Sequence, residues 1–219
     1  MEKQLRCVHY LNQFFGQVGG EGKANIPLQI IEGSVGPGAV LQKALQGEGT
    51  VVATIISGDN YFIEEKEKAL LEFNRALDKI EPDLVIAGPA FYAGRYGLAC
   101  AAVCKAAQRK GIAAVTAMFP ENPGVLEHRR EVYIFPTRDV ATGMAEAIEQ
   151  MVNFGKKLVR GEPIGTADEE GYLPKGIRKS GTAPEAGYKR AVDMLAMKIR
   201  GGPFKTELPV ILPEQVRPA

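Results

Sequence analysis

Residues 51–87 read VVATIISGDNYFIEEKEKALLEFNRALDKIEPDLVIA, and this stretch predicts the fold class. Segment 51–56 is continuous and β-branched, as expected of a strand that is covered on both faces. Segment 64–80 alternates apolar and charged residues so that Ala69, Phe73 and Leu77 share one stripe, which is typical of an amphipathic helix. A second apolar run follows at 84–87. Strand, helix and strand in this order indicate a βαβ unit and hence a parallel sheet.

The same alternation continues on both sides of this unit. Further strands are expected at 6–11, 112–117 and 132–135. Further helices are expected at 38–46, in an Ala-rich segment ending near Gly111, and at 139–159 with Asp139 as N-cap. The sequence therefore predicts a three-layer α/β fold with a mainly parallel, twisted sheet of about five strands. Its topology is expected to be flavodoxin-like or Rossmann-like, with strand order 2-1-3-4-5 in the flavodoxin-like case.

The composition changes after the core, and three regions are expected. Residues 1–161 form the α/β core domain. Residues 162–202 form a loop and a C-terminal helix, at 185–199, which pack on that core. Residues 203–219 contain four prolines without a helical period and predict an extended tail or linker. A linker in that place indicates that a further module follows it.

Composition and charge exclude several classes of protein. The chain has 219 residues, of which 45% are hydrophobic and 24% charged, so it is neither disordered nor collagen-like. A net charge of +1 gives no general attraction to nucleic acid or to a membrane surface. No apolar stretch approaches the roughly 20 residues that span a bilayer, and the N-terminus lacks the apolar core of a signal peptide. We therefore expect a cytoplasmic location, while the 25 glycines need an explanation of their own.

The glycines are concentrated where a ligand is expected. In an open parallel sheet, ligands bind at the carboxyl ends of the strands, where the strand order reverses. That position lies between the first and third strands, so the loops at 14–22 and 88–97 should face each other across one crevice. Residues 57–62 and 119–125 are expected to join them there.

Three features of these loops suggest how a ligand is held. The glycines around Gly19 and Gly20 expose N–H groups that suit a carboxylate or phosphate, although their spacing fits neither a dinucleotide fingerprint nor a P-loop, and a simple flexible turn is the alternative. Arg95, in the first turn of a helix, can hold a carboxylate in a bidentate grip, or it is a solvated helix residue. Glu121, on a loop stiffened by prolines, can meet an ammonium or a partner residue, or it belongs to a surface turn. The predicted substrate-binding residues are Gly19, Gly20, Glu21, Asp59, Asn60, Tyr92, Arg95, Glu121 and Asn122.

Neither a metal site nor a catalytic residue is predicted. Cys100 and Cys104 share one face of the Ala-rich helix, where buried thiols more often serve as small apolar groups than in metal or redox chemistry. His9 and His128 are too isolated to complete a zinc site, and no classical nucleophile motif is present.

Six segments taken together carry a family resemblance. In chain order they are HYLNQFFGQVGGE (9–21), GSVGPG (33–38), GDNYF (58–62), GPAFYAGRYG (88–97), PENPGV (120–125) and GYLPKGIRK (171–179). They resemble the selenoprotein B subunit of the glycine, sarcosine and betaine reductase complexes. Because the match covers nearly the whole chain in order, it is far more specific than any single motif.

The resemblance implies a component of an oxidoreductase complex in amino-acid (Stickland-type) fermentation. Such a complex cleaves the C–N bond of glycine or an N-methylated glycine reductively. In the family, a pyruvoyl group on a partner subunit engages the amine in the glycine-type systems. The carboxymethyl group then passes to the selenium of the small selenoprotein A, and a third component releases acetyl phosphate. The expected partners are these subunits and a glycine-like molecule, in a homo- or hetero-oligomer, with no cofactor in this chain.

The chain also departs from the family pattern. Full-length members carry selenocysteine in a later half, whereas this sequence has no such position and no cysteine after Cys104. The chain is then the N-terminal module of a longer or split protein, or a relative without redox chemistry of its own.

Three hypotheses follow. The first is a substrate-side module of the reductase, and whether it is itself an enzyme stays open. The second is a non-catalytic module that docks partner subunits through its glycine-rich loops and the basic segment 171–179. The third is a flavodoxin-like or isomerase-like domain with another ligand, for which a bound flavin would be diagnostic.

Overall fold

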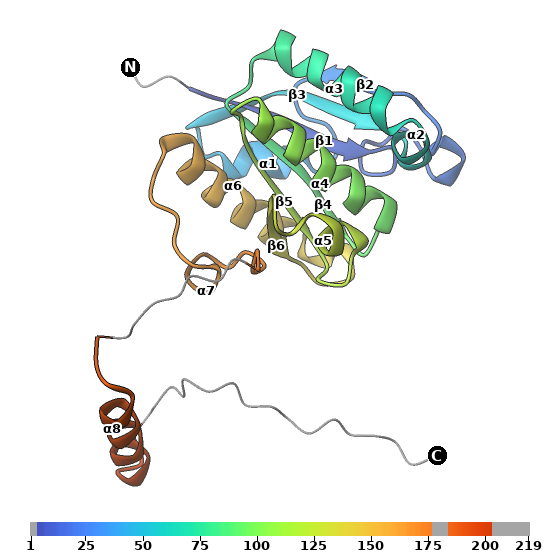
Figure 1. Ribbon diagram of the computed structural model, residues 1–219. Coiled ribbons are helices and arrows are strands. Elements are labelled where there is room, and N and C mark those ends of the chain that lie inside the picture. Colours follow the sequence, from blue (N-terminus) through green and yellow to red (C-terminus); the bar gives the residue numbers. More distant parts are fainter. Residues whose placement is uncertain (1–3, 177–183, 203–219) are drawn as a thin grey trace, which may run out of the picture. The chain divides into compact units, whose positions relative to one another are not determined.

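The computed structural model describes residues 4–176 and 184–202, and the tail expected at 203–219 lies outside them (Figure 1). The chain divides into two compact units, Met1–Ile177 and Arg178–Ala219, which are described separately. None of the helices in the described ranges is both long enough and apolar enough to cross a membrane.

The first unit is built on one six-stranded sheet in the order β2-β3-β1-β4-β5-β6. The strands are β1 (Leu5–Asn12), β2 (Gln29–Glu32), β3 (Gly49–Ser57), β4 (Leu84–Phe91), β5 (Ala113–Met118) and β6 (Tyr133–Pro136). Five of them are parallel and follow the predicted flavodoxin-like order, which confirms the α/β fold class. The sixth strand, β2, was not predicted. It pairs antiparallel with β3, and all four of its residues are exposed, so it carries no burial pattern.

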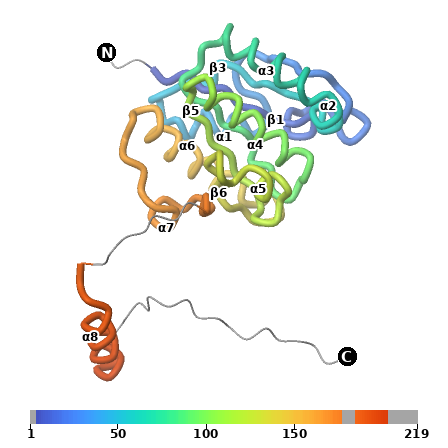
Figure 2. The backbone as a smooth tube through the Cα atoms, in the orientation of Figure 1, coloured from blue at the N-terminus to red at the C-terminus, as the bar shows by residue number. Residues whose placement is uncertain are grey.

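Helices cover both faces of this sheet. They are α1 (Gly38–Ala44), α2 (Asp59–Glu64), α3 (Lys66–Ile80), α4 (Gly94–Arg109), α5 (Pro123–His128), α6 (Met144–Arg160) and α7 (Ala167–Glu170), with 3-10 turns at Glu21–Lys23 and Ala141–Gly143. Helices α2, α3 and α4 share an apolar cluster on one face, whereas α1 and α6 share the cluster on the other (Figure 2). The three predicted layers are therefore present.

The two clusters explain why the parallel strands read as continuous apolar runs. Tyr10 of β1 belongs to the first cluster, where its ring lies 6.0 Å from that of Phe62 and 6.1 Å from that of Phe73. Cys7 of the same strand belongs to the second cluster. A strand covered on both faces needs apolar side chains at successive positions.

Two helix boundaries differ from the sequence prediction. The long helix begins at Met144 with Gly143 as N-cap, so the expected start at Asp139 is wrong. Val140 has extended backbone, with φ −113° and ψ 156°, and this separates Asp139 from the helix. Residues 59–62, expected as part of a loop, belong to the short helix α2, and the helix expected at 64–80 begins at Lys66.

Residues 162–176 belong to the first unit. The N–H of Leu173 donates to the carbonyl of Ile134 in β6 at 2.7 Å. The ring of Tyr172 packs edge-on against Tyr133, with centroids 5.1 Å apart. This segment therefore lies along the β6 edge of the sheet.

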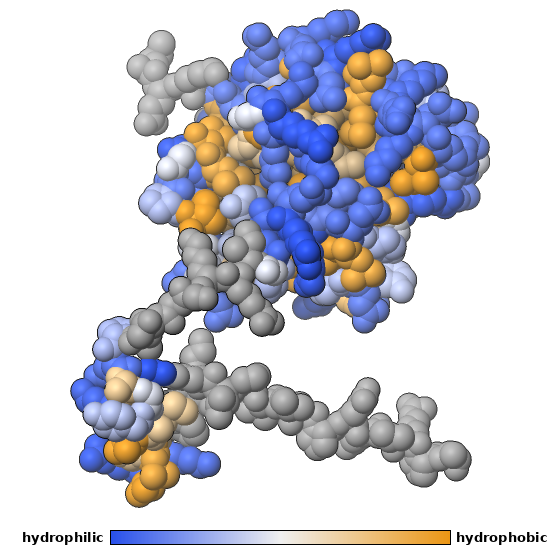
Figure 3. Space-filling view, viewed as in Figure 1, coloured by the Kyte–Doolittle hydropathy of each residue, from blue (hydrophilic) through white to orange (hydrophobic). Residues whose placement is uncertain are grey.

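The second unit contains α8 (Gly187–Ile199), which confirms a helix where one was expected. Apolar and charged side chains are both exposed along it (Figure 3). That α8 packs on the core, as the sequence suggested, stays a prediction.

Helices α4 and α5 cross at two glycines. A Cβ atom on Gly97 would lie 2.0 Å from Oδ1 of Asn122, and one on Gly124 would lie 2.5 Å from the carbonyl oxygen of Gly97. Real Cβ atoms essentially never approach so closely, and a packed interior relaxes only partially. Glycine is therefore required at both positions by close approach.

Replacing Gly97 by alanine should destabilise the protein by about 2 kcal/mol, because overpacking exceeds the ~1 kcal/mol that alanine gains in a helix. Chemical denaturation measures this loss. Gly22→Ala is the matched control, since a Cβ there meets nothing within 4 Å, and it should change stability by less than about 0.5 kcal/mol. Equal midpoints for the two variants would contradict the close-contact explanation.

Candidate functional site

A cavity of about 320 Å³ lies at the carboxyl ends of the parallel strands. Its lining comprises Asn12, Gln13, Phe14, Phe15, Gly20, Glu21, Asp59, Ala90, Phe91, Tyr92, Ala93, Asp139 and Ala141. The loops after β1 and β4 thus form two of its walls, and Asp59 after β3 contributes a third, as the topology predicted. No residue of the expected loop 119–125 is in this lining, whereas Asp139 and Ala141, which were not predicted, line the cavity.

Asp59 is the buried charged group of the cavity. It is 9% exposed and opens α2 directly after β3. Its Oδ2 accepts a hydrogen bond from Nδ2 of Asn12 at 2.9 Å and a longer one from Nε2 of Gln13 at 3.4 Å. The backbone N–H of Asp59 donates to Oε1 of Gln13 at 2.9 Å. The carboxylate is therefore fixed in orientation by Asn12, the last residue of β1, and by Gln13, which follows it.

The electrostatic setting of Asp59 is unfavourable to its charge. Burial raises the pKa of Asp59, and the hydrogen bonds from Asn12 and Gln13 and the positive charge of Arg95 offset this only in part. Among the described residues, no group forms a hydrogen bond with its second oxygen, Oδ1. One carboxylate oxygen is thus buried without a hydrogen bond.

Arg95 closes the rim of the site. Its Nη2 lies 2.7 Å from Oε1 of Glu21, and its Nη1 donates to Oδ1 of Asn60. The Arg95 side chain is 48% exposed and is not among the residues that line the cavity. The guanidinium therefore ties the loop after β1 to helix α2.

Asn122 is placed differently, because its amide is used entirely within the protein. It is fully buried, and its Nδ2 donates to the carbonyls of Phe91 at 2.9 Å and Ala93 at 3.1 Å. Its Oδ1 accepts from the N–H of Gly124 at 2.9 Å and so caps α5. Asn122 thus holds the backbone of the cavity wall.

That wall carries backbone strain. Phe91 has φ 51°, in the left-handed region that bulky side chains rarely adopt. Such a conformation costs on the order of 1–3 kcal/mol and persists only where its surroundings impose it. The hydrogen bond from Asn122 is one of those constraints, and the N–H of Phe119, at 3.0 Å from the same carbonyl, is another.

The predicted residues divide into three groups. Gly20, Glu21, Asp59 and Tyr92 line the cavity, whereas Arg95 and Asn60 bridge its rim. Gly19, Glu121 and Asn122 are not in the lining, although Gly19 lies beside it in the loop after β1, where its N–H donates to the carbonyl of Gln13 at 3.3 Å. Glu121 is exposed.

The prediction omitted Asn12 and Gln13, together with the aromatic residues Phe14, Phe15 and Phe91. A signal for the first two was present, because two amides directly follow an apolar strand at the edge where ligands bind. The aromatic residues carried no comparable signal, since their exposure depends on the loop conformation.

The thiols and histidines do not form a reactive group. Cys7, Cys100 and Cys104 are free and fully buried, and burial raises the pKa of each, to about 12 for Cys7. Burial lowers the pKa of His9 to about 4, and its Nε2 lies 2.8 Å from the carbonyl oxygen of Gly88. In the described ranges, no three His, Cys, Asp or Glu side chains gather as a metal site would require.

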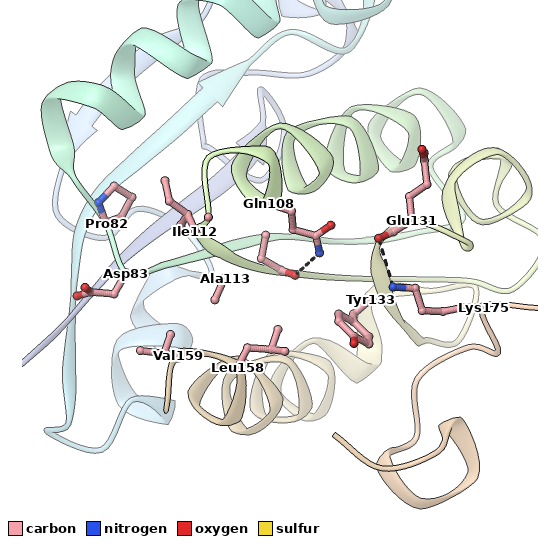
Figure 4. Close-up of a pocket in the computed structure, with 12 residues that line it drawn as sticks. Pro82, Asp83, Gln108, Ile112, Ala113, Glu131, Tyr133, Leu158, Val159 and Lys175 are labelled. Carbon is pink, nitrogen blue, oxygen red and sulfur yellow. Dashed lines mark hydrogen bonds between the residues drawn. The ribbon is translucent and has the colours of Figure 1, made fainter. Parts of the chain in front are cut away.

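A second cavity, of about 540 Å³, lies at the opposite, amino end of β4 to β6 (Figure 4). Its charged groups are already engaged. Nζ of Lys175 donates to the carbonyl of Glu131 at 3.3 Å and lies 4.1 Å from the centre of the Tyr133 ring. The Glu131 carboxylate is paired with Lys105 at 2.6 Å. The candidate site is therefore the smaller cavity, whose lining includes Asp59 with its unpaired oxygen.

The fold and cavity define an open, mainly parallel α/β domain with a small polar and aromatic site at the strand-order reversal. A family model described as glycine/sarcosine/betaine reductase selenoprotein B matches residues 4–219. The chain belongs to this family.

Curated relatives agree with this assignment. The chain is 52% identical over 216 residues to "Glycine reductase complex component B subunit gamma" of Carboxydothermus hydrogenoformans, covering 98% of this chain and 50% of the relative. It is 42% identical over 217 residues to "Sarcosine reductase complex component B subunit beta" of Peptoclostridium acidaminophilum, covering 99% and 50%. It is 41% identical over 208 residues to "Betaine reductase complex component B subunit beta" of the same organism, covering 94% and 47%. The chain thus spans about half the length of these relatives. No solved structure matches it.

Replacing Asn122 by alanine should lower the free energy of unfolding by about 3 kcal/mol, because it removes the side-chain hydrogen bonds to the carbonyls of Phe91 and Ala93 and to the N–H of Gly124, at about 1 kcal/mol each. Urea denaturation monitored by circular dichroism measures the change. The adjacent Glu121→Ala is the control and should stay within about 0.5 kcal/mol of the parent, since Glu121 is exposed. If Asn122→Ala were as mild as this control, the cavity wall would not depend on Asn122.

Proposed function

We propose that this chain is a substrate-binding part of component B of a glycine, sarcosine or betaine reductase complex. In this role its carboxyl-edge cavity binds glycine or an N-methylated glycine for reductive cleavage of the C–N bond. One observation carries the proposal. The segments that mark the family resemblance, at 9–21, 58–62 and 88–97, are the segments that supply most of the lining of this one cavity.

The size of the cavity supports a small ligand. Its volume of about 320 Å³ is at the low end of the range of about 300–1,000 Å³ for small-molecule sites. We assign Gly20, Glu21, Asp59 and Tyr92 to direct contact with the substrate, and Arg95 and Asn60 to closing the rim. Gly19 and Glu121 belong to the surrounding loops, while Asn122 positions the wall.

The reactive groups are proposed to come from partner subunits. A pyruvoyl group on one partner would engage the amine, and a selenol, on small selenoprotein A or in a following module, would accept the carboxymethyl group. The three thiols of this chain are buried and protonated, which suits a chain that binds substrate rather than one that exchanges electrons. A cytoplasmic oligomer follows from the same proposal.

The second unit favours a second function, the docking of partner subunits. In α8, Tyr188, Val192, Leu195 and Ile199 recur at helical spacing, and each is at least 58% exposed. An amphipathic face of this kind is typical of helices that bind in a groove. Co-purification with a pyruvoyl subunit without small-molecule binding would favour docking as the main role.

Calorimetry of the full chain against glycine, sarcosine and betaine tests the first function, and at least one should bind. Arg95→Ala should weaken that binding about two- to fivefold, because an exposed ion pair contributes up to about 1 kcal/mol. Lys105→Ala is the matched control on the same helix. It removes a comparable ion pair, with Glu131, far from the cavity and should leave affinity unchanged. Binding that neither variant alters would show that the Arg95 bridge does not shape the site.

A further inference from the structure

We infer that Asp59 is the group that recognises the charged nitrogen of the ligand, and that the cavity selects small ammonium or methylammonium compounds over carboxylates that lack this nitrogen. The inference rests on the proposed function and deepens it, because it assigns the recognition of one end of the substrate to one oxygen atom.

The first argument is the geometry of the Asp59 carboxylate. Oδ2 is held by the amides of Asn12 and Gln13. Oδ1 is buried and accepts no hydrogen bond from the described residues, and the residue that carries it lines the cavity. Buried polar atoms in proteins are almost always hydrogen-bonded. The carboxylate of this lining residue therefore has one acceptor without an internal donor, and a ligand bound against Asp59 would supply that donor.

The second argument is charge. A buried carboxylate without a paired cation costs free energy, and this cost is expressed in the raised pKa of Asp59. Arg95 stabilises the Asp59 charge only by longer-range electrostatic attraction, because its guanidinium forms its hydrogen bonds with Glu21 and Asn60. A ligand that brings its own positive charge removes this cost, whereas a simple carboxylate would add repulsion.

The third argument is the set of aromatic residues that line the same cavity as Asp59. Phe14, Phe15, Phe91 and Tyr92 line the cavity, and Phe15 lies against Phe14 at 5.4 Å and Phe91 at 6.2 Å between ring centres. Aromatic faces attract cations, and they are the usual surroundings of methylated ammonium groups. Glu21, Asp59 and Asp139 all line the cavity, but in the described ranges no three such side chains gather as a metal site requires, so the lining fits an alkylammonium ion better than a metal ion, which needs several oxygen ligands.

The decisive variant is Asp59→Asn. The asparagine carbonyl can keep the hydrogen bonds from Asn12 and Gln13 while the negative charge is lost. Titration calorimetry of the full chain would use betaine and glycine as zwitterions, tetramethylammonium chloride and methylammonium chloride as nitrogen-only probes, and sodium acetate as the nitrogen-free probe. Asp78→Asn is the matched control, since it makes the same change at an exposed position of α3 that does not line the cavity.

We expect Asp59→Asn to weaken binding of the nitrogen-containing probes about ten- to hundredfold, as loss of a charge-assisted hydrogen bond implies. Acetate should bind no better than tetramethylammonium to the parent chain, and Asp78→Asn should retain nearly full affinity. The melting temperature of Asp59→Asn should be equal to or above that of the parent, because a buried, unpaired charge has been removed. A purely structural role for Asp59 would instead lower it.

Failures of the two proposals are distinguishable. Undiminished binding of betaine or glycine by Asp59→Asn would overturn the inference and leave the proposed function standing. Asp59-dependent binding of tetramethylammonium or methylammonium without binding of glycine, sarcosine or betaine would support the inference and overturn the proposed substrates. A lowered melting temperature of Asp59→Asn, or a parent chain that binds none of the nitrogen compounds, would overturn the inference.

Discussion

The burial of β1 on both faces is the constraint from which the site follows. The strand is buried from Cys7 to Asn12, and its His9 is engaged with the Gly88 carbonyl, so the side chains that can serve the site are those where the strand ends. At that edge Asn12 and Gln13 meet the start of α2 and hold Asp59. The alternation of strands and helices therefore sets both the sheet and the position of its one oriented carboxylate.

A second set of contacts keeps the opposite wall in place. Helices α4 and α5 approach each other through Gly97 and Gly124, and this close approach brings the Asn122 amide under the carbonyls of Phe91 and Ala93. The hydrogen bond from Asn122 thus stabilises the left-handed backbone conformation of Phe91, and Phe91 can line the cavity. Gly97 and Gly124 do not line the cavity, yet they are needed to position its wall.

The sequence predicted the elements that rest on burial and missed those that rest on local geometry. The five parallel strands and their order follow from apolar runs separated by amphipathic helices. Strand β2 is fully exposed and has no such pattern, and the start of α6 is set by the extended backbone at Val140. The same distinction, between what burial patterns predict and what local geometry decides, applies to the candidate site residues. The convergence of the loops was predictable from topology. The roles of Arg95, which bridges two protein side chains, and of Asn122, which supports the backbone, were not predictable, because hydrogen-bond partners depend on three-dimensional contacts.

The burial of all three cysteines has a practical meaning for work on an assembly whose chemistry is proposed to run on selenols and thiols. Cys7, Cys100 and Cys104 are inaccessible in the folded chain, and burial raises their pKa values. They should therefore react neither with alkylating reagents nor by disulfide exchange. A cysteine introduced at an exposed position such as Gly22 would then be the single labelled site on this subunit. A fluorophore or cross-linker placed there would report on the binding of partners near the cavity. The three native cysteines would not first have to be replaced, because they are buried.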